Sequence, residues 1–143
     1  MPPRSLMSVY GEQAECAFVF RAMQHGLIVC KPYGNSTPYD FVVQARRPGH
    51  AAPAPGAPLW RIQVKSSFGL FHESAYKIST EHCGRPYTCT DFDFFAAWIA
   101  PLDVWYILPV RAIIPSRSVG FFPHVPRTRS KYEKYREAWE LLL

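Results

Sequence analysis

The sequence is poor in cysteine and contains no Cys-x-x-Cys pair, because its four cysteines lie at positions 16, 30, 83 and 89. Structural zinc sites need four ligands, usually paired at a spacing of two to four residues. His82, Cys83 and Cys89 make a poor match to that pattern, so we expect no zinc site. We expect reduced thiols throughout, with Cys16 and Cys30 as small core residues.

The sequence also lacks long hydrophobic runs. No stretch reaches the roughly 18 uncharged apolar residues that a membrane span needs, and the first eight residues have no hydrophobic signal-peptide segment. We therefore expect a cytoplasmic protein with no membrane partner. The 143 residues are 48% hydrophobic and 19% charged, which excludes wholesale disorder and predicts a single domain over residues 1–143.

Acidic residues are absent between Arg111 and Lys131. The chain carries 16 Lys and Arg against 11 Asp and Glu, and the segment 111–143 holds 7 of these basic groups against 3 acidic ones. This excess favours an anionic partner such as nucleic acid, although ordinary solubility charge would also account for it.

Hydrophobic periodicity predicts an α/β fold with a central mixed sheet of four or five strands. Helical spacing covers about 8–25, where Gly26 suits a left-handed C-terminal cap, and apolar residues on more than one side predict burial between two layers. Strands are expected at 27–31, 40–46, 59–66, 75–80, 92–99 and 104–110. A mobile loop rich in Pro, Ala and Gly occupies 47–58, and 81–90 and 111–129 are expected to be irregular.

The C-terminal segment is predicted to form a second helix. Ser130 and Glu133 have the spacing of a capping box, and Tyr132, Tyr135, Trp139 and Leu142 follow on one helical face. We expect the first helix on one face of the sheet and this helix on another.

Polar side chains gather on two of the predicted strands. Arg61, Gln63 and Lys65 alternate with apolar residues, and Asp40 begins the preceding strand. If these strands form a hairpin, Asp40, Gln63 and Lys65 share one face near one end of the sheet. Phosphodiester hydrolysis uses a divalent metal and a nearby cation, so Asp40 suits a metal ligand and Lys65 that cation. Turn formation and surface solvation are simpler explanations of the same residues.

Several motifs together resemble the PD-(D/E)XK nucleases. They are Gly11-Glu12-x-x-Glu15 on the first helix, Tyr39-Asp40, Gln63-x-Lys65, Asp93-Phe94-Phe95 and the segment from Trp105 to Val110. The pattern looks most like the branch found in group I intron homing endonucleases, in which Gln replaces the usual acid, and is more distantly similar to archaeal Holliday junction resolvases. It covers about 11–110. The chain departs from the motif in having Tyr39 between Pro38 and Asp40.

The resemblance implies a restriction-endonuclease-like core and a role for each motif residue. Asp40 binds the catalytic metal, Gln63 borders it, the Val64 carbonyl ligates it, Lys65 assists the attacking water, and Glu15 supports the metal through water. Either Glu12 or Glu15 could face the sheet, and Glu15 is the better match to the motif.

The expected activity is that of a Mg²⁺-dependent endonuclease, with Mn²⁺ as a substitute, acting on double-stranded DNA as a homodimer or larger homo-oligomer. A junction resolvase and a DNA-binding module that no longer cuts are the alternatives. The predicted DNA-contacting residues are Arg111, Arg117, Arg127, Arg129 and Lys131, together with Arg46, Arg47 and Arg61.

Overall fold

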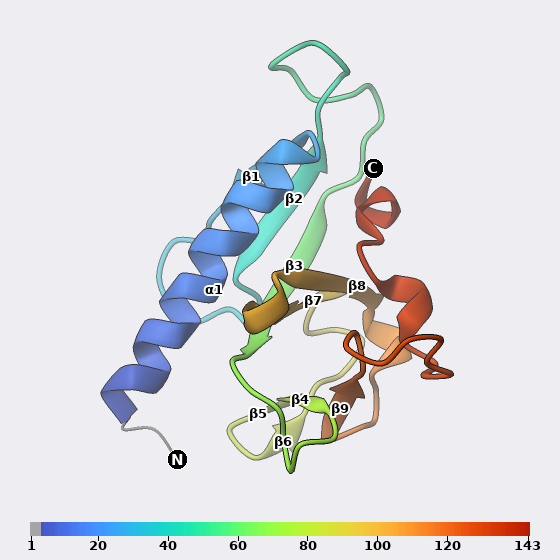
Figure 1. Ribbon diagram of the computed structural model, residues 1–143. Coiled ribbons are helices and arrows are strands. Elements are labelled where there is room, and N and C mark those ends of the chain that lie inside the picture. The colour runs from blue at the N-terminus through green and yellow to red at the C-terminus, as the bar shows by residue number, and fades with distance from the viewer. Residues whose placement is uncertain (1–3) are drawn as a thin grey trace.

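The computed structural model describes residues 4–143 and centres on a five-stranded sheet (Figure 1). In spatial order the strands are β1 (Leu27–Cys30), β2 (Phe41–Ala45), β3 (Trp60–Ser67), β7 (Phe94–Ile99) and β8 (Val104–Pro109). β3 and β7 run parallel, and the other neighbours are antiparallel. The predicted mixed sheet is therefore confirmed.

Two small antiparallel sheets accompany the central one. The first pairs β4 (Tyr76–Ser79) with β9 (Ser118–Phe121), and the second pairs β5 (Glu81–His82) with β6 (Arg85–Pro86). β9 and the β5–β6 hairpin lie in segments that were predicted to be irregular. Single 3-10 turns make up η1 (Ala100–Leu102), η2 (Val110–Ala112), η3 (Glu133–Tyr135) and η4 (Trp139–Leu142).

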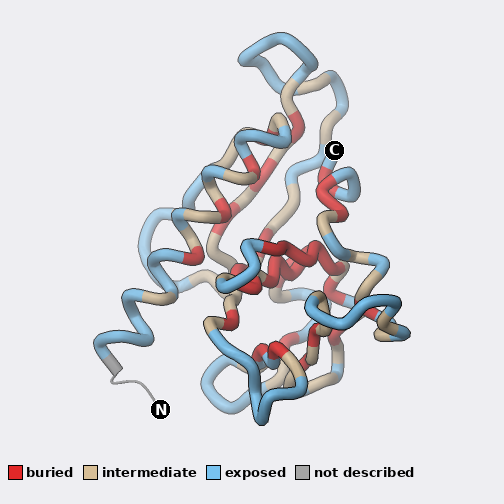
Figure 2. The backbone as a smooth tube through the Cα atoms, in the orientation of Figure 1, coloured by how far each residue is buried: buried red, intermediate tan, exposed pale blue. Residues whose placement is uncertain are grey.

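The first helix, α1 (Arg4–Gln24), begins before the predicted start and ends as expected. Gly26 follows it with a φ of 78°, which is the left-handed conformation that a C-terminal cap requires. Ala14, Phe18 and Ala22 are buried against the sheet, whereas Phe20 keeps 67% of its surface exposed. The prediction that this helix is buried between two layers was therefore wrong, because the outer face of α1 is open to solvent (Figure 2).

The central sheet carries a hydrophobic core on each face. Along β7 and β8, alternate residues point to opposite sides, so that Trp105 joins one core and Tyr106 the other. The first core lies under α1 and includes Phe18, Trp105 and Trp139, whose rings lie within 6 Å of one another between centroids. The second core lies under β4, β9 and the segments around them.

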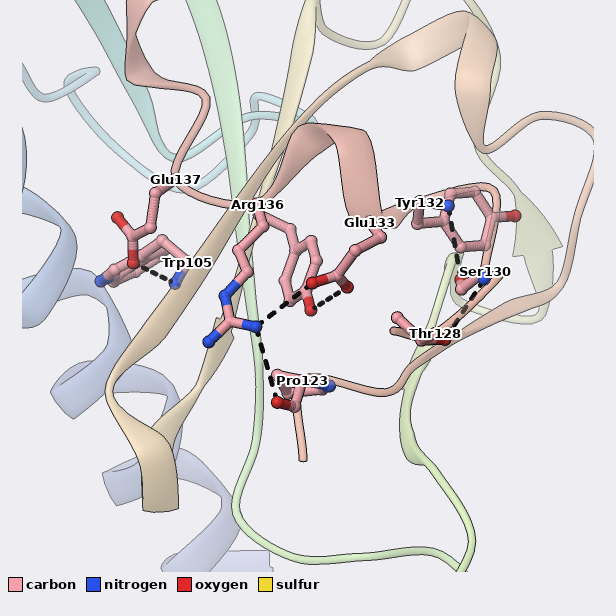
Figure 3. A network of polar contacts seen from close by, with 9 residues as sticks. Trp105, Pro123, Thr128, Ser130, Tyr132, Glu133, Arg136 and Glu137 are labelled. Carbon is pink, nitrogen blue, oxygen red and sulfur yellow. Dashed lines mark hydrogen bonds and ion pairs between the residues drawn. The ribbon is translucent and has the colours of Figure 1, made fainter. Parts of the chain in front are cut away.

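The predicted C-terminal helix is wrong. Its residues form η3 and η4 instead, and Trp139 of η4 packs on the same face as α1. The Ser130 hydroxyl accepts a hydrogen bond from the Tyr132 amide, and the Glu133 carboxylate accepts one from the Tyr106 hydroxyl at 2.9 Å (Figure 3). Glu137 accepts a bond from the Trp105 amide at 2.9 Å. The Glu137 backbone amide donates to the Trp105 carbonyl oxygen of β8 at 2.8 Å rather than to a preceding helical turn, and α1 is the single α-helix within residues 4–143.

The loop 47–58 joins β2 to β3 as predicted, and backbone hydrogen bonds from Arg47 to Ala52 and from Ala54 to Ala45 close its base. All four cysteines are free and exposed, so the expectation of buried Cys16 and Cys30 was wrong. In the described part of the chain, no helix has the length and apolarity needed to span a bilayer.

Candidate active site

Asp40 stands immediately before β2, beside the middle of β3. Because β2 and β3 are hairpin neighbours, with Phe41 opposite Ile62, the Asp40 carboxylate reaches the next residues of β3. Its Oδ2 accepts a hydrogen bond from the Val64 amide at 2.8 Å and another from the Gln63 side-chain Nε2 at 3.0 Å. The sequence motifs are thus brought into direct contact.

The Gln63 side-chain amide lies between two oxygens of the site. Its Nε2 also donates to the Val64 carbonyl oxygen at 3.2 Å, so one NH₂ group bridges the Asp40 carboxylate and that carbonyl. These are the two oxygens to which the resemblance assigns metal ligation. Gln63 therefore holds together two oxygens of the type that a hard cation prefers.

Glu15 reaches the same place from α1. It lines a cavity of about 260 Å³ together with Lys31, Asp40, Gln63 and His82, and its carboxylate binds the Lys31 ammonium at 2.7 Å. Glu12 does not line this cavity; it borders a neighbouring hollow between α1 and the sheet, which Glu15 and Phe41 also line. Of the two glutamates, Glu15 is the one that shares a cavity with Asp40.

Lys65 follows on β3 and is half-buried. Its Nζ lies 3.4 Å from the Glu81 carbonyl oxygen, to which it donates, and 5.9 Å from the centroid of the Tyr87 ring. Burial lowers the pKa of Lys65, and the Asp40 charge opposes that shift. The result is a partly desolvated ammonium close to a carboxylate.

Burial has the opposite effect on Asp40. It raises the pKa of this carboxyl group, and the negative charge of Glu15 adds to the increase. The Val64 amide and the positive charges of Lys31 and Lys65 hold the pKa down. Asp40 is therefore a carboxylate that would gain from a cation placed beside it.

The donor set fits a small hard cation. The structure offers the Asp40 and Glu15 carboxylates and the Val64 carbonyl, which are all oxygen ligands, and Mg²⁺ typically takes one or two carboxylates while keeping several waters. Among residues 4–143 no cluster of three or more His, Cys, Asp and Glu side chains is placed to hold a metal.

The predicted DNA-contacting arginines fall into different surroundings. Arg61 is engaged within the fold: its guanidinium binds the Asp93 carboxylate at 3.0 Å and donates to the Thr90 carbonyl at 2.7 Å. Arg117 pairs with Glu81 at 2.7 Å. Internal partners thus compete with DNA for both.

The other predicted contacts have no acidic partner among the described residues. Arg111, Arg127, Arg129 and Lys131 are exposed and make no ion pair in that part of the chain. Arg46 and Arg47 lie at the end of β2 away from Asp40, where they line a cavity of about 650 Å³ under the loop 47–58. These two groups belong to separate regions of the surface.

Sequence reasoning missed Lys31, His82 and Tyr87. Lys31 reaches the site from the end of β1, and His82 and Tyr87 belong to the segment of the β5–β6 hairpin. No local pattern marks these residues, because their position depends on how two irregular segments fold back on the sheet.

The fold and these contacts define a nuclease of the PD-(D/E)XK class, and comparison with known proteins agrees. The family model described as PD-(D/E)XK endonuclease matches residues 8–142, so the chain belongs to that family. No curated protein sequence matches it. Among solved structures, it is similar to a bacterial homing endonuclease, I-Ssp6803I, with a TM-score of 0.76 and 29% identity over 95% of this chain and 92% of that one. The predicted restriction-endonuclease-like core is confirmed.

Proposed function

We propose that the protein is a Mg²⁺-dependent endonuclease that hydrolyses phosphodiester bonds of double-stranded DNA. The observation that carries this proposal is the convergence of Asp40, Gln63, Val64 and Lys65 at one point of the sheet, with Glu15 reaching it from α1. The similar structure is that of a homing endonuclease, which supports DNA as the substrate.

Each residue has a defined part in this chemistry. Asp40, Glu15 and the Val64 carbonyl would hold the cation, which supplies Lewis acidity and lowers the pKa of a water molecule when it is bound. Mn²⁺, which also takes oxygen ligands, would substitute for Mg²⁺. Lys65 orients the attacking water and stabilises the negative charge that grows on the phosphate. Gln63 fixes the Asp40 carboxylate in place through its 3.0 Å hydrogen bond.

The proposal includes self-association. One chain supplies one such site, so cutting both strands of a duplex requires at least two copies. Closed symmetry is the usual solution, and we propose a homodimer or a larger homo-oligomer.

Incubation with supercoiled plasmid and Mg²⁺ tests the function. Asp40→Asn and Lys65→Ala should each lower the cleavage rate by about 10²-fold or more while DNA binding in EDTA is retained. Lys134→Ala is a matched control, because Lys134 also lies over a tyrosine ring, at 5.2 Å, but away from Asp40. It should cleave like the wild type.

Three outcomes would contradict the proposal. Full activity in either site variant would refute the site, and binding without cleavage by the wild type in Mg²⁺ and Mn²⁺ would identify a DNA-binding module. Preference for a four-way junction over a linear duplex would identify a junction resolvase instead.

A further inference from the structure

A second cavity, of about 610 Å³, lies next to the candidate active site at the end of β3. Residues of the first half of α1 and of the chain that leaves β3 line it, and its size is that of a small-molecule binding pocket. Its wall includes the aromatic residues Tyr10, Phe68 and Phe71 and the lysines Lys65 and Lys77. None of its lining residues is acidic.

This cavity is next to the site described above, because two residues of β3 belong to both. Val64 and Lys65 line it, and the same two residues face Asp40 and the β5–β6 hairpin. A group that enters the cavity would therefore lie next to any phosphate held by Lys65. The cavity beneath the loop 47–58, by contrast, lies at the opposite end of β2 and shares no residue with the site.

The side chains of the cavity suit a nucleobase with its phosphate. Tyr10 and Phe68 stack on each other, with ring centroids 4.0 Å apart and planes 11° from parallel, and both half-buried rings line the cavity. Phe71 keeps 48% of its surface exposed, and the Lys77 ammonium lies 4.7 Å from its ring centroid. Exposed aromatic rings beside lysines are the combination with which proteins bind unpaired nucleotides. The positive charge opposes a cationic or purely apolar occupant.

We propose that this cavity receives an unpaired nucleobase of the cleaved strand, next to the scissile phosphate. Phe71 stacks on the base, and Lys77 contacts a neighbouring phosphate. The inference rests on the proposed nuclease function and adds to it a requirement: one nucleotide beside the cut leaves the helical stack.

Binding to two DNA probes in EDTA tests the inference. One probe is a fluorescent duplex, and the other is the same duplex with a short internal unpaired segment that carries 2-aminopurine. Phe71→Ala should weaken binding of the unpaired probe about tenfold and leave the paired probe within about twofold, because stacking on a base is lost. Lys77→Ala should weaken it in the same direction. On binding, wild-type protein should quench 2-aminopurine, and Phe71→Ala should not.

Three control variants accompany these substitutions. Leu70 is 42% exposed beside Phe71 but does not line the cavity, so Leu70→Ala should bind both probes like the wild type. Lys134→Ala removes a lysine over another aromatic ring, at 5.2 Å from Tyr135, and should do the same. Phe71→Tyr retains a ring and should retain the quenching.

The possible failures are distinct. Equal weakening of both probes, or no effect of Phe71→Ala in a protein that still cleaves plasmid, would overturn the cavity inference alone. Absence of both DNA binding and cleavage in the wild type would overturn the proposed function, and this inference with it.

Discussion

Replacing Gln63 with Glu places a second carboxylate against Asp40 and tests how the site balances negative and positive charge. In the metal-free protein the substitution removes two hydrogen bonds, of 3.0 Å to Asp40 and 3.2 Å to the Val64 carbonyl. At about 1 kcal/mol each, their loss costs about 2 kcal/mol of unfolding free energy. Two full charges about 3 Å apart would repel by about 5 kcal/mol at an effective dielectric constant of 20.

The repulsion is relieved by proton uptake rather than expressed in full, because two carboxyl groups that share a site raise the pKa of one of them. We therefore expect the metal-free Gln63→Glu variant to lose about 2–4 kcal/mol, or roughly 6–12 °C in Tm for a domain of this size. The folded variant holds its extra proton to a higher pH than the unfolded chain does. Its deficit should accordingly grow as the pH rises above the unfolded carboxyl pKa of about 4.

Mg²⁺ should reverse much of this loss. A carboxylate contributes more to a cation than an amide does, so the variant should bind Mg²⁺ more tightly than the wild type does. A tenfold gain in affinity would add about 1.4 kcal/mol at saturating metal. Thermal denaturation in EDTA and across a Mg²⁺ series measures the effect independently of catalysis, and plasmid cleavage follows activity.

Gln44→Glu is the matched control for this experiment. Gln44 is half-buried on β2 and donates one hydrogen bond, at 3.2 Å, to the Ala57 carbonyl oxygen. The control should lose stability in EDTA without any gain in its response to Mg²⁺. If Gln63→Glu responds to Mg²⁺ no more than the wild type, the ligand assignment is wrong. A folded but inactive variant would show that the amide donor is required.

Three further predictions follow from separate parts of the structure. The Arg127→Ala, Arg129→Ala double variant should lower the slope of log affinity against log salt by about two, whereas an unchanged slope in a metal-free binding series would remove these residues from the DNA surface. Arg61→Ala should cost about 1–2 kcal/mol at pH 7, because it breaks the partly exposed Asp93 pair. Burial alone would raise the pKa of Asp93, but the hydrogen bonds from Arg61 hold that pKa below its usual value. The stabilisation by this ion pair is thus present above the pKa of about 3.9 that Asp93 has in the unfolded chain, and it is lost as the pH falls through the folded pKa. Chemical denaturation should therefore show that Arg61→Ala loses less unfolding free energy at pH 3 than at pH 7. Gly26→Ala should cost about 1 kcal/mol in the same assay, since its φ is 78°, and an unaffected variant would show that the cap conformation is not required.

The strands of the central sheet were predictable because their signals are local. Alternating apolar residues and flanking prolines place 59–66 and 40–46 within a residue or two of β3 and β2. The aromatic run at 92–99 likewise contains β7. The parallel pairing of β3 with β7, in contrast, could not be predicted from local signals. It joins residues about 32 positions apart, and no local pattern reports it.

The prediction of a C-terminal helix was wrong because tertiary contacts decide the conformation of this segment. Its sequence has both the capping-box spacing and an apolar face, yet Glu133 and Glu137 bind groups of β8 instead of the local backbone. Tyr106 also forms an isolated β-bridge with Arg136. Such partners become visible only when β8 is already in place.

The site shows the same division between local and distant information. Asp40 and Gln63-x-Lys65 were found because they lie on two adjacent strands, whereas the cations that balance them come from elsewhere. Lys31 reaches Glu15 from the end of β1, at 2.7 Å, and the charge of Lys65 on β3 acts on Asp40. The positive charges of Lys31 inside the cavity and of Lys65 outside its lining thus both oppose the negative charge of Asp40.

This balance gives a physical reason for glutamine at position 63. A third carboxylate would leave the metal-free cavity with excess negative charge, in a place where burial already raises the pKa of Asp40. The neutral amide avoids that charge and uses its NH₂ group to bridge Asp40 and the Val64 carbonyl. Glutamine thus keeps the site assembled before a cation binds, at the cost of one charged ligand once it is bound.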